Sequence, residues 1–333
     1  MSTAPPFVAE EEVVFDGGAD APLCPLDGVD LRKALPDELF ERRPWRFVAK
    51  FLLAYTIVAG AIGACIITSH WAGKVVSVVV LGLMYAHLVE LQHECLHRHA
   101  FSSRRMNRAF GFLAGLPMLS SHSHYRHDHL RHHAYMGTAR NREFFNYRFE
   151  HLDSVWGFLC AACHMGRYVD VFIDMGRSYL SRPPRRGCAA KDAAEIRRDY
   201  RLYGLALVAA LAYTVIARDA LFLWVWVLPA FVAEPTHFLI EMPEHFGLNT
   251  QSKGHVMANT RTIRAGWLGT WFTNGNNLHT AHHYHQGVPM TRLPRLHESI
   301  RDRLEVIEPS YWVFFTKVIR GEIQNHPDTC MTR

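Results

Sequence analysis

Four long apolar stretches constrain the fold of this 333-residue chain more than any other feature. Residues 51–70 carry no fixed charge, and three more stretches of this kind follow. A helix needs about 20 apolar residues to cross the hydrocarbon core of a bilayer. The stretches therefore predict four transmembrane helices in two hairpins. The predicted spans cover about residues 47–70, 74–92, 202–217 and 220–241.

The distribution of basic residues predicts how these helices cross the membrane. Lysine and arginine gather before the first span and in the long loop after the second, whereas the two hairpin turns hold only Lys74 and Arg218. Because cytoplasmic loops carry an excess of lysine and arginine, we expect both termini and the central loop in the cytoplasm. These loops account for the net charge of +5, so we predict the lipid bilayer of the cell membrane as a partner, and no nucleic acid.

The rest of the chain is expected to form helices around this membrane core, with very little strand. We expect residues 1–45 to form a mobile N-terminal tail and a lead-in to the first span, because most of this segment is rich in alanine, proline and acidic residues. Residues 46–300 form the predicted membrane domain, and residues 301–333 a peripheral C-terminal helix and tail. The predicted fold class is therefore all-α, an integral membrane protein with a cytoplasmic helical cap.

Three histidine clusters follow the apolar stretches or lie between them. They read His93-Glu-Cys-Leu-His97, His129-Leu-Arg-His132-His133 and His279-Thr-Ala-His282-His283. Imidazole is the commonest metal ligand among side chains, and a pair spaced i, i+3 or i, i+4 lies on one face of a helix. Eight clustered histidines exceed what one ion needs. The clusters therefore predict a histidine-rich di-metal site in the cap, on the cytoplasmic side.

The residues alone leave two other metal functions open. His93, Glu94 and His97 spell H-E-x-x-H, in which the glutamate is the general base of a zinc metalloprotease. A zinc protease mechanism would not use the histidines of the two HxxHH clusters. A histidine-rich metal transporter is disfavoured, because the clusters lie outside the predicted spans or at their ends.

The three clusters resemble the histidine boxes of the membrane fatty acid desaturase family, part of the di-iron integral-membrane desaturase and hydroxylase superfamily. The first box is followed by Phe101, and the third by residues 287–297, which end in Pro-Arg-Leu-His, as in that family. The resemblance covers roughly residues 45–300. It implies His245, near the end of the last span, as a ninth ligand. It also implies two iron ions shared by the nine histidines, with zinc as a substitute in purified protein.

Other polar residues could support such a site, and we expect no catalytic residue beyond the metal ligands. Ligating histidines usually donate their second N–H to a carboxylate or carbonyl group. The candidates for this supporting role are Glu94, Glu241 and Asn277. The nearest substitutes for a ligand are His124, His127 and His285, which we expect to lie outside the site.

The resemblance implies an O2-dependent di-iron desaturase that introduces a double bond into an acyl chain of a lipid or a thioester-bound fatty acid. A hydroxylase, a ketolase or an oxidase of a specialised small metabolite are alternatives within the superfamily, and a membrane zinc metalloprotease is one outside it. The sequence has no second CxxC pair and no glycine-rich dinucleotide fingerprint. A separate electron donor such as ferredoxin, with its reductase, is therefore implied.

Overall fold

The computed structural model describes residues 35–325, except 139, 148, 150, 151, 153 and 251–254. The described chain is almost entirely helical and contains four helices that are long and apolar enough to cross a membrane. This confirms the predicted fold class and the number of spans. Most of the predicted N-terminal tail, residues 1–34, lies outside the described residues.

The four long helices extend further than the apolar stretches did. The first two are α1 (Pro44–Ile67) and α2 (Trp71–Leu96), the third is α7 (Ala190–Ala217), and the fourth joins a π-helical segment, η2 (Leu223–Val227), to α8 (Leu228–His245). Helix α7 begins at Ala190, before the predicted span, and its charged first turns pack on α4 (His122–Tyr135) and α6 (Gly166–Tyr179). Pro229 lies two residues after the end of the π-helical segment, and a proline has no N–H to continue regular α-helical bonding.

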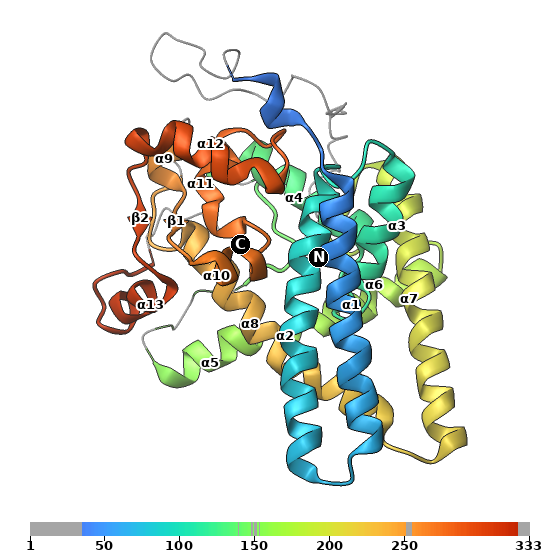
Figure 1. Ribbon diagram of the computed structural model, residues 1–333. Helices are drawn as coiled ribbons and strands as arrows, with labels where there is room; N and C mark the ends of the chain where they lie inside the picture. Colours follow the sequence, from blue (N-terminus) through green and yellow to red (C-terminus); the bar gives the residue numbers. More distant parts are fainter. Residues whose placement is uncertain are drawn as a thin grey trace, which may run out of the picture.

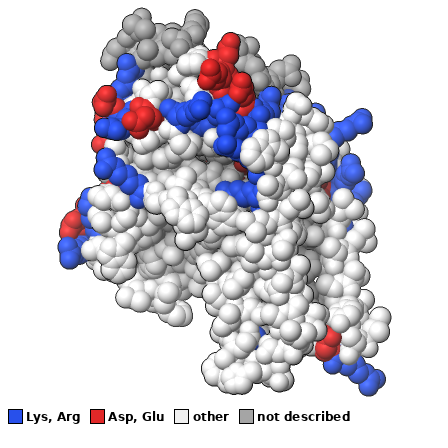
Figure 2. Space-filling view, in the orientation of Figure 1, with Lys and Arg blue, Asp and Glu red and all other residues white. Residues whose placement is uncertain are grey.

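The two hairpins point the same way. The turn between α1 and α2 and the turn after α7 lie at one end of the molecule, and the shorter helices gather at the other (Figure 1). Figure 2 shows charged side chains concentrated at the end with the shorter helices, while the lower half of that face is nearly free of them. Ile67 is 85% exposed and Ile216 is 82% exposed. Exposed apolar side chains at this end match a surface that faces lipid.

Helix α2 is the centre of the bundle. It packs against α1, α8 and α3, and its second half is buried on all sides. Gly82 lets α8 approach closely, because a Cβ atom at this position would lie 2.4 Å from the Cβ of Val232. The end of α2 with His93 and His97 is thereby carried into the protein interior instead of facing lipid.

The remaining elements form what we call the helical cap. In chain order they are η1 (Asp37–Phe40), α3 (Arg104–Gly115), α4 (His122–Tyr135), α5 (Val155–Cys163), α6 (Gly166–Tyr179), α9 (Val256–Asn259), β1 (Thr262–Ile263), α10 (Trp267–Phe272), η3 (Asn276–Leu278), α11 (His279–Tyr284), η4 (Met290–Arg292), α12 (Leu293–Ile300), η5 (Arg301–Arg303), β2 (Ile307–Glu308) and α13 (Tyr311–Ile319). Strands β1 and β2 pair in parallel, with Thr262 opposite Ile307. Ser310 caps α13 by accepting a hydrogen bond from the N–H of Val313.

Candidate metal centre

Nine histidines from four helices converge where α2 meets the helical cap. Their ring nitrogens form two groups, and within each group the nitrogens all lie within 4.8 Å of one another. The five-histidine group contains His93, His97, His129, His133 and His282. The four-histidine group contains His132, His245, His279 and His283. The structure therefore brings together all nine residues named from the sequence.

The position of each histidine along its helix sets the direction of its side chain. The spacing of His93 and His97 puts both on one face of α2, next to α4 and α11. Helix α4 begins after Ser121, whose hydroxyl accepts a hydrogen bond from the N–H of His124. His129 and His133 of α4 face the five-histidine group, while His132 faces the other. Helix α4 therefore contributes to both groups.

The separations between ring nitrogens fit a shared cation. The Nε2 atom of His129 lies 2.7 Å from that of His93, 2.9 Å from that of His97 and 3.0 Å from that of His133. One Nε2 atom carries at most a single hydrogen, so hydrogen bonding satisfies one of these three contacts at a time. Two nitrogens bound at right angles to one metal, at about 2.1 Å each, lie about 3 Å apart. Metal ligation accounts for all three separations together.

The other ring nitrogens are held by acceptors, as expected for metal ligands. The Nδ1 atom of His132 lies 3.1 Å from Oδ1 of Asn141, and that of His245 lies 2.9 Å from the carbonyl oxygen of Asn259. The Nδ1 atom of His279 lies 3.2 Å from Oδ1 of Asn276. Because these oxygens only accept, each Nδ1 carries the hydrogen and each Nε2 keeps its lone pair free.

Burial also favours the ligating form of the rings. Desolvation lowers the pKa of His97, His133 and His279 well below 6.5, so these imidazoles are neutral at pH 7. Burial by itself would raise the pKa of Glu143, but its contacts with His132 and His129 lower it below its usual value. Neutral imidazoles beside a charged carboxylate suit a divalent cation.

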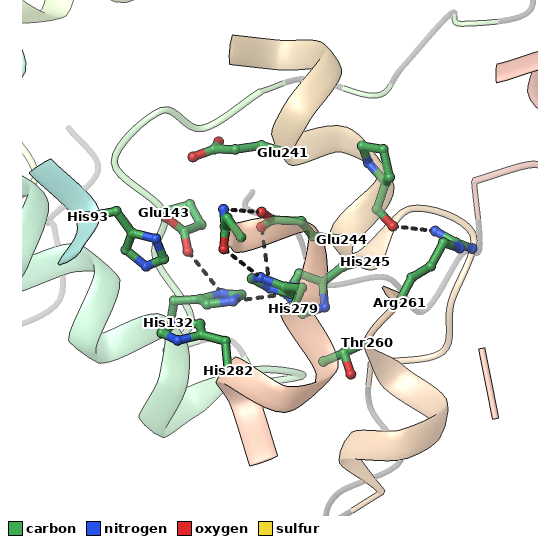
Figure 3. A network of polar contacts seen from close by, with 12 residues as sticks. His93, His132, Glu143, Glu241, Glu244, His245, Thr260, Arg261, His279 and His282 are labelled. Carbon is green, nitrogen blue, oxygen red and sulfur yellow. Dashed lines mark hydrogen bonds and ion pairs between the residues drawn. The ribbon is translucent and has the colours of Figure 1, made fainter. Parts of the chain in front are cut away.

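Two unanticipated carboxylates lie beside the histidines, one next to an Nδ1 atom and the other next to an Nε2 atom. The Oε1 atom of Glu143 lies 3.2 Å from Nδ1 of His132, and Oε2 of Glu244 lies 3.3 Å from Nε2 of His279 (Figure 3). Asn276 donates a 2.6 Å hydrogen bond to Glu244 and so links it to the third box. Glu244 precedes His245 directly, which was a usable signal. Glu143 lies in an irregular segment after the second box, and no local pattern marked it.

The three supporting residues named from the sequence have other contacts. Glu94 accepts a 2.9 Å hydrogen bond from Asn274. Glu241 accepts a 3.3 Å hydrogen bond from Tyr125, lies 3.4 Å from His237, and makes no marked contact with the labelled histidines in Figure 3. Asn277 accepts from Thr273 and donates to the carbonyl oxygen of Ile263. Asn276, one residue earlier, makes the contact with a ligating histidine, His279, that was proposed for Asn277.

The three substitute histidines lie outside both groups. The Nδ1 atom of His124 is 2.8 Å from the hydroxyl of Tyr200, and that of His127 is 2.8 Å from a carboxylate oxygen of Asp192. The ring of His285 packs edge-on against Phe40. Neighbouring side chains therefore account for their positions without a metal.

The fold and this site define a membrane-embedded helical protein with a nine-histidine candidate metal centre. The family model for fatty acid desaturases matches residues 69–315, and the chain belongs to the fatty acid desaturase family.

Three curated relatives illustrate the similarity. The chain is 28% identical over 134 residues to the sn-2 acyl-lipid omega-3 desaturase (ferredoxin), chloroplastic, of Helianthus annuus, an alignment that covers 40% of this chain and 30% of that protein. It is 26% identical over 143 residues to the omega-3 fatty acid desaturase, chloroplastic, of Brassica napus, covering 43% and 35%. It is 27% identical over 114 residues to the sn-1 acyl-lipid omega-3 desaturase (ferredoxin) of Synechocystis sp., covering 34% and 32%. The aligned parts thus span about a third of each relative.

Proposed function

We propose that the protein is an O2-dependent membrane desaturase that introduces a double bond into an acyl chain. The observation that carries this proposal is the division of nine histidines into two groups with converging Nε2 atoms, in a chain of the desaturase family. The acyl chain belongs to a lipid or to a thioester-bound fatty acid. A protease is disfavoured, because Asn274 holds the carboxylate of Glu94, which a zinc protease would need as its base.

The nine histidines would hold two iron ions, one in each group, and zinc could occupy the same nitrogens in purified protein. When bound, the iron ions supply O2 activation and the oxidising power to remove hydrogen from an unactivated C–H bond. Glu143, Asn141 and Asn276 orient the ligands through their Nδ1 atoms. Burial of the ligands keeps water from competing for the site.

The reaction needs electrons from outside the chain. Removal of two hydrogens from neighbouring carbons, together with O2, two electrons and two protons, gives an alkene and two molecules of water. We propose ferredoxin, with its reductase, as the donor, because the names of two relatives include ferredoxin. The basic side chains proposed to attract such an acidic carrier are Arg182, Lys191, Arg197 and Arg198, whereas the neighbouring Arg185 and Arg186 line a cavity that also holds aspartates.

We also propose that the metal centre faces the cytoplasm. The hairpin ends hold Lys74, in the first turn of α2, and Arg218, which follows α7, while the helical cap and the segment before α1 are rich in arginine. The positive-inside rule then places the turns outside and the cap inside. Accessibility of single cysteines introduced at Asp219 and at Asp302 tests this orientation. Labelling of Asp302→Cys from outside intact cells would contradict it.

The test of function is mass spectrometry of lipids and metabolites from cells that express the protein. The matched variants are His282→Ala, which removes one proposed ligand, and His255→Ala, which removes a half-exposed histidine that belongs to neither group. We expect a species lighter by two hydrogens with the wild type and His255→Ala, and none with His282→Ala. A species heavier by one oxygen would show that the protein hydroxylates its substrate and does not desaturate it. Equal products from all three proteins would refute the metal-dependent reaction.

A further inference from the structure

A cavity of about 510 Å³ lies beside the metal centre. It is lined by residues of α4, α6 and α7 and by the segment 144–146, which directly follows Glu143. His124 and Asp128 of α4 line the cavity, whereas His129, one residue further on, belongs to the five-histidine group. The cavity and the metal centre therefore share helix α4 but use different side chains of it.

The inner wall of this cavity holds polar groups without partners. The Asp128 side chain is 1% exposed, and neither carboxylate oxygen has a hydrogen-bond partner among the described residues. The Nε2 atom of His124 lies 3.7 Å from Asp128, and burial lowers the pKa of this imidazole, so it does not neutralise the carboxylate. Arg167 is also buried. Its Nε and Nη2 atoms bind Glu234 and the carbonyl oxygen of Met118, but its Nη1 atom has no partner in the described part of the chain.

Such groups indicate a polar ligand. Burying a carboxylate or a guanidinium nitrogen without a hydrogen bond is costly, and native structures rarely leave one unsatisfied. A bound group that donates to Asp128 and accepts from Arg167 would remove both costs. A hydroxyl group can do both, and so can a head group that carries an ammonium and a phosphate. A simple anion satisfies Arg167 but is repelled by Asp128.

The charge of the cavity excludes a polyanion. The three arginines and three aspartates that line it balance each other, and they are Arg167, Arg185, Arg186, Asp128, Asp170 and Asp174. Arg185 already pairs with Asp170, and its N–H donates to Asp174. Arg167 pairs with Glu234 as well. No excess positive charge therefore remains to attract the several phosphates of a coenzyme A thioester.

The surroundings place this cavity next to lipid. Helix α6 borders it and exposes Phe172 and Ile173, and α5, which ends at its edge, exposes Val155 and Trp156. Exposed apolar and tryptophan side chains of this kind lie at membrane surfaces. The aromatic wall of the cavity also reaches the metal centre, because the ring of Tyr125 packs against the wall residues Phe144 and Phe145 and against His129.

We propose that this cavity binds the head group of the substrate, and that the head group is net uncharged and bears hydrogen-bond donors. This inference rests on the proposed desaturase function. It implies that the substrate is an acyl chain esterified in a lipid and not a coenzyme A thioester. A separate head-group site suits the chemistry, since a double bond within an acyl chain forms many carbons away from the head group.

Native mass spectrometry of the purified full chain in detergent tests the binding directly. The probes are equal amounts of phosphatidylethanolamine, monoglucosyl diacylglycerol, phosphatidylglycerol and stearoyl coenzyme A. We expect the wild type to retain one or both net-uncharged lipids, and the two probes show whether an ammonium or hydroxyls are preferred. Asp128→Asn should lower that retention about tenfold, the usual effect of losing one hydrogen bond to a charged group. The control Asp302→Asn, an exposed carboxylate in η5, should bind like the wild type.

A second pair of variants avoids any effect of Asp128 on folding. Gly166 lines the cavity, and a Cβ atom there would meet nothing within 4 Å. Gly166→Leu should fill the cavity and abolish lipid retention. Gly176→Leu makes the same change on the same helix, also in open space but outside the cavity lining, and should leave retention intact.

The outcomes separate this proposal from the proposed function. Equal retention of all four probes, preference for phosphatidylglycerol or stearoyl coenzyme A, or retention by Gly166→Leu would overturn the head-group site even if desaturation continues. Selective retention by the wild type and its loss in both cavity variants would support the site even if no desaturation product forms. In that case the reaction assignment would fail and the lipid site would stand.

Discussion

Glu143 lies between the two histidine groups, and its charge should matter to both. Its Oε1 atom lies 3.2 Å from Nδ1 of His132, in the four-histidine group, and 3.5 Å from Nδ1 of His129, in the five-histidine group. Glu143→Gln keeps the size of the side chain and removes its charge. We expect weaker iron binding in both groups, because both rings lose the carboxylate that orients them.

The structure predicts unequal losses. His132 keeps a second acceptor, Oδ1 of Asn141 at 3.1 Å. Nδ1 of His129 makes no hydrogen bond among the described residues, and its 3.5 Å contact with the Glu143 carboxylate is electrostatic, so the loss of charge leaves it nothing in exchange. Loss of such an outer contact usually costs about 10- to 100-fold in metal affinity. We expect about tenfold for the four-histidine group and closer to a hundredfold for the five-histidine group.

Iron retained per chain, measured by plasma mass spectrometry across a graded series of chelator concentrations, gives these affinities. The wild type should release its iron in a high chelator range, and Glu143→Gln should release one ion well before the other. The control is Glu195→Gln, a carboxylate that pairs with Arg104 and Arg108 away from both groups. A Glu143→Gln curve that coincides with that of the wild type would refute the bridging role.

Three further outcomes follow from the packing. The pKa values of buried His133, His279 and His282 lie well below 6.5, so these side chains take up protons in acid when the protein unfolds. The melting temperature of iron-free protein should therefore fall from pH 7 to pH 5. A melting temperature that does not change over this range would contradict the burial of neutral histidines. Arg167→Met should destabilise the chain by about 3–5 kcal/mol in thermal or denaturant unfolding, since it leaves buried Glu234 unpaired, and adding Glu234→Leu should recover part of that loss. Gly82→Leu should lower the free energy of unfolding by at least about 1–3 kcal/mol, because the larger side chain pushes α2 away from α8. Unchanged stability would show that the two helices separate easily.

The spans could be predicted from the sequence because their physical requirement is local. An apolar run of sufficient length has few other uses, so four runs indicated four helices. Their ends were harder to place. Helix α7 begins at Ala190 because the charged turns before residue 202 pack against α4 and α6, and hydropathy carries no information about such contacts.

The supporting residues of the site depended on tertiary packing, and the sequence indicated them poorly. Asn276 and Asn277 are neighbours of equal chemistry, but the 3₁₀ turn η3 directs the first to His279 and the second to Ile263. Glu143 reaches the histidines from an irregular segment without a helical or strand period. Histidine boxes, by contrast, lie on helices, where spacing along the chain sets the direction of each side chain.

The order of the ligands along the chain has a consequence for biosynthesis. Each histidine group takes at least one member from α11, which begins at His279 and follows both hairpins in the chain. A ribosome that has inserted both hairpins into the membrane has therefore not yet made a complete set of ligands for either ion. A chain truncated before α11 would therefore keep its spans but would lack at least one histidine of each group.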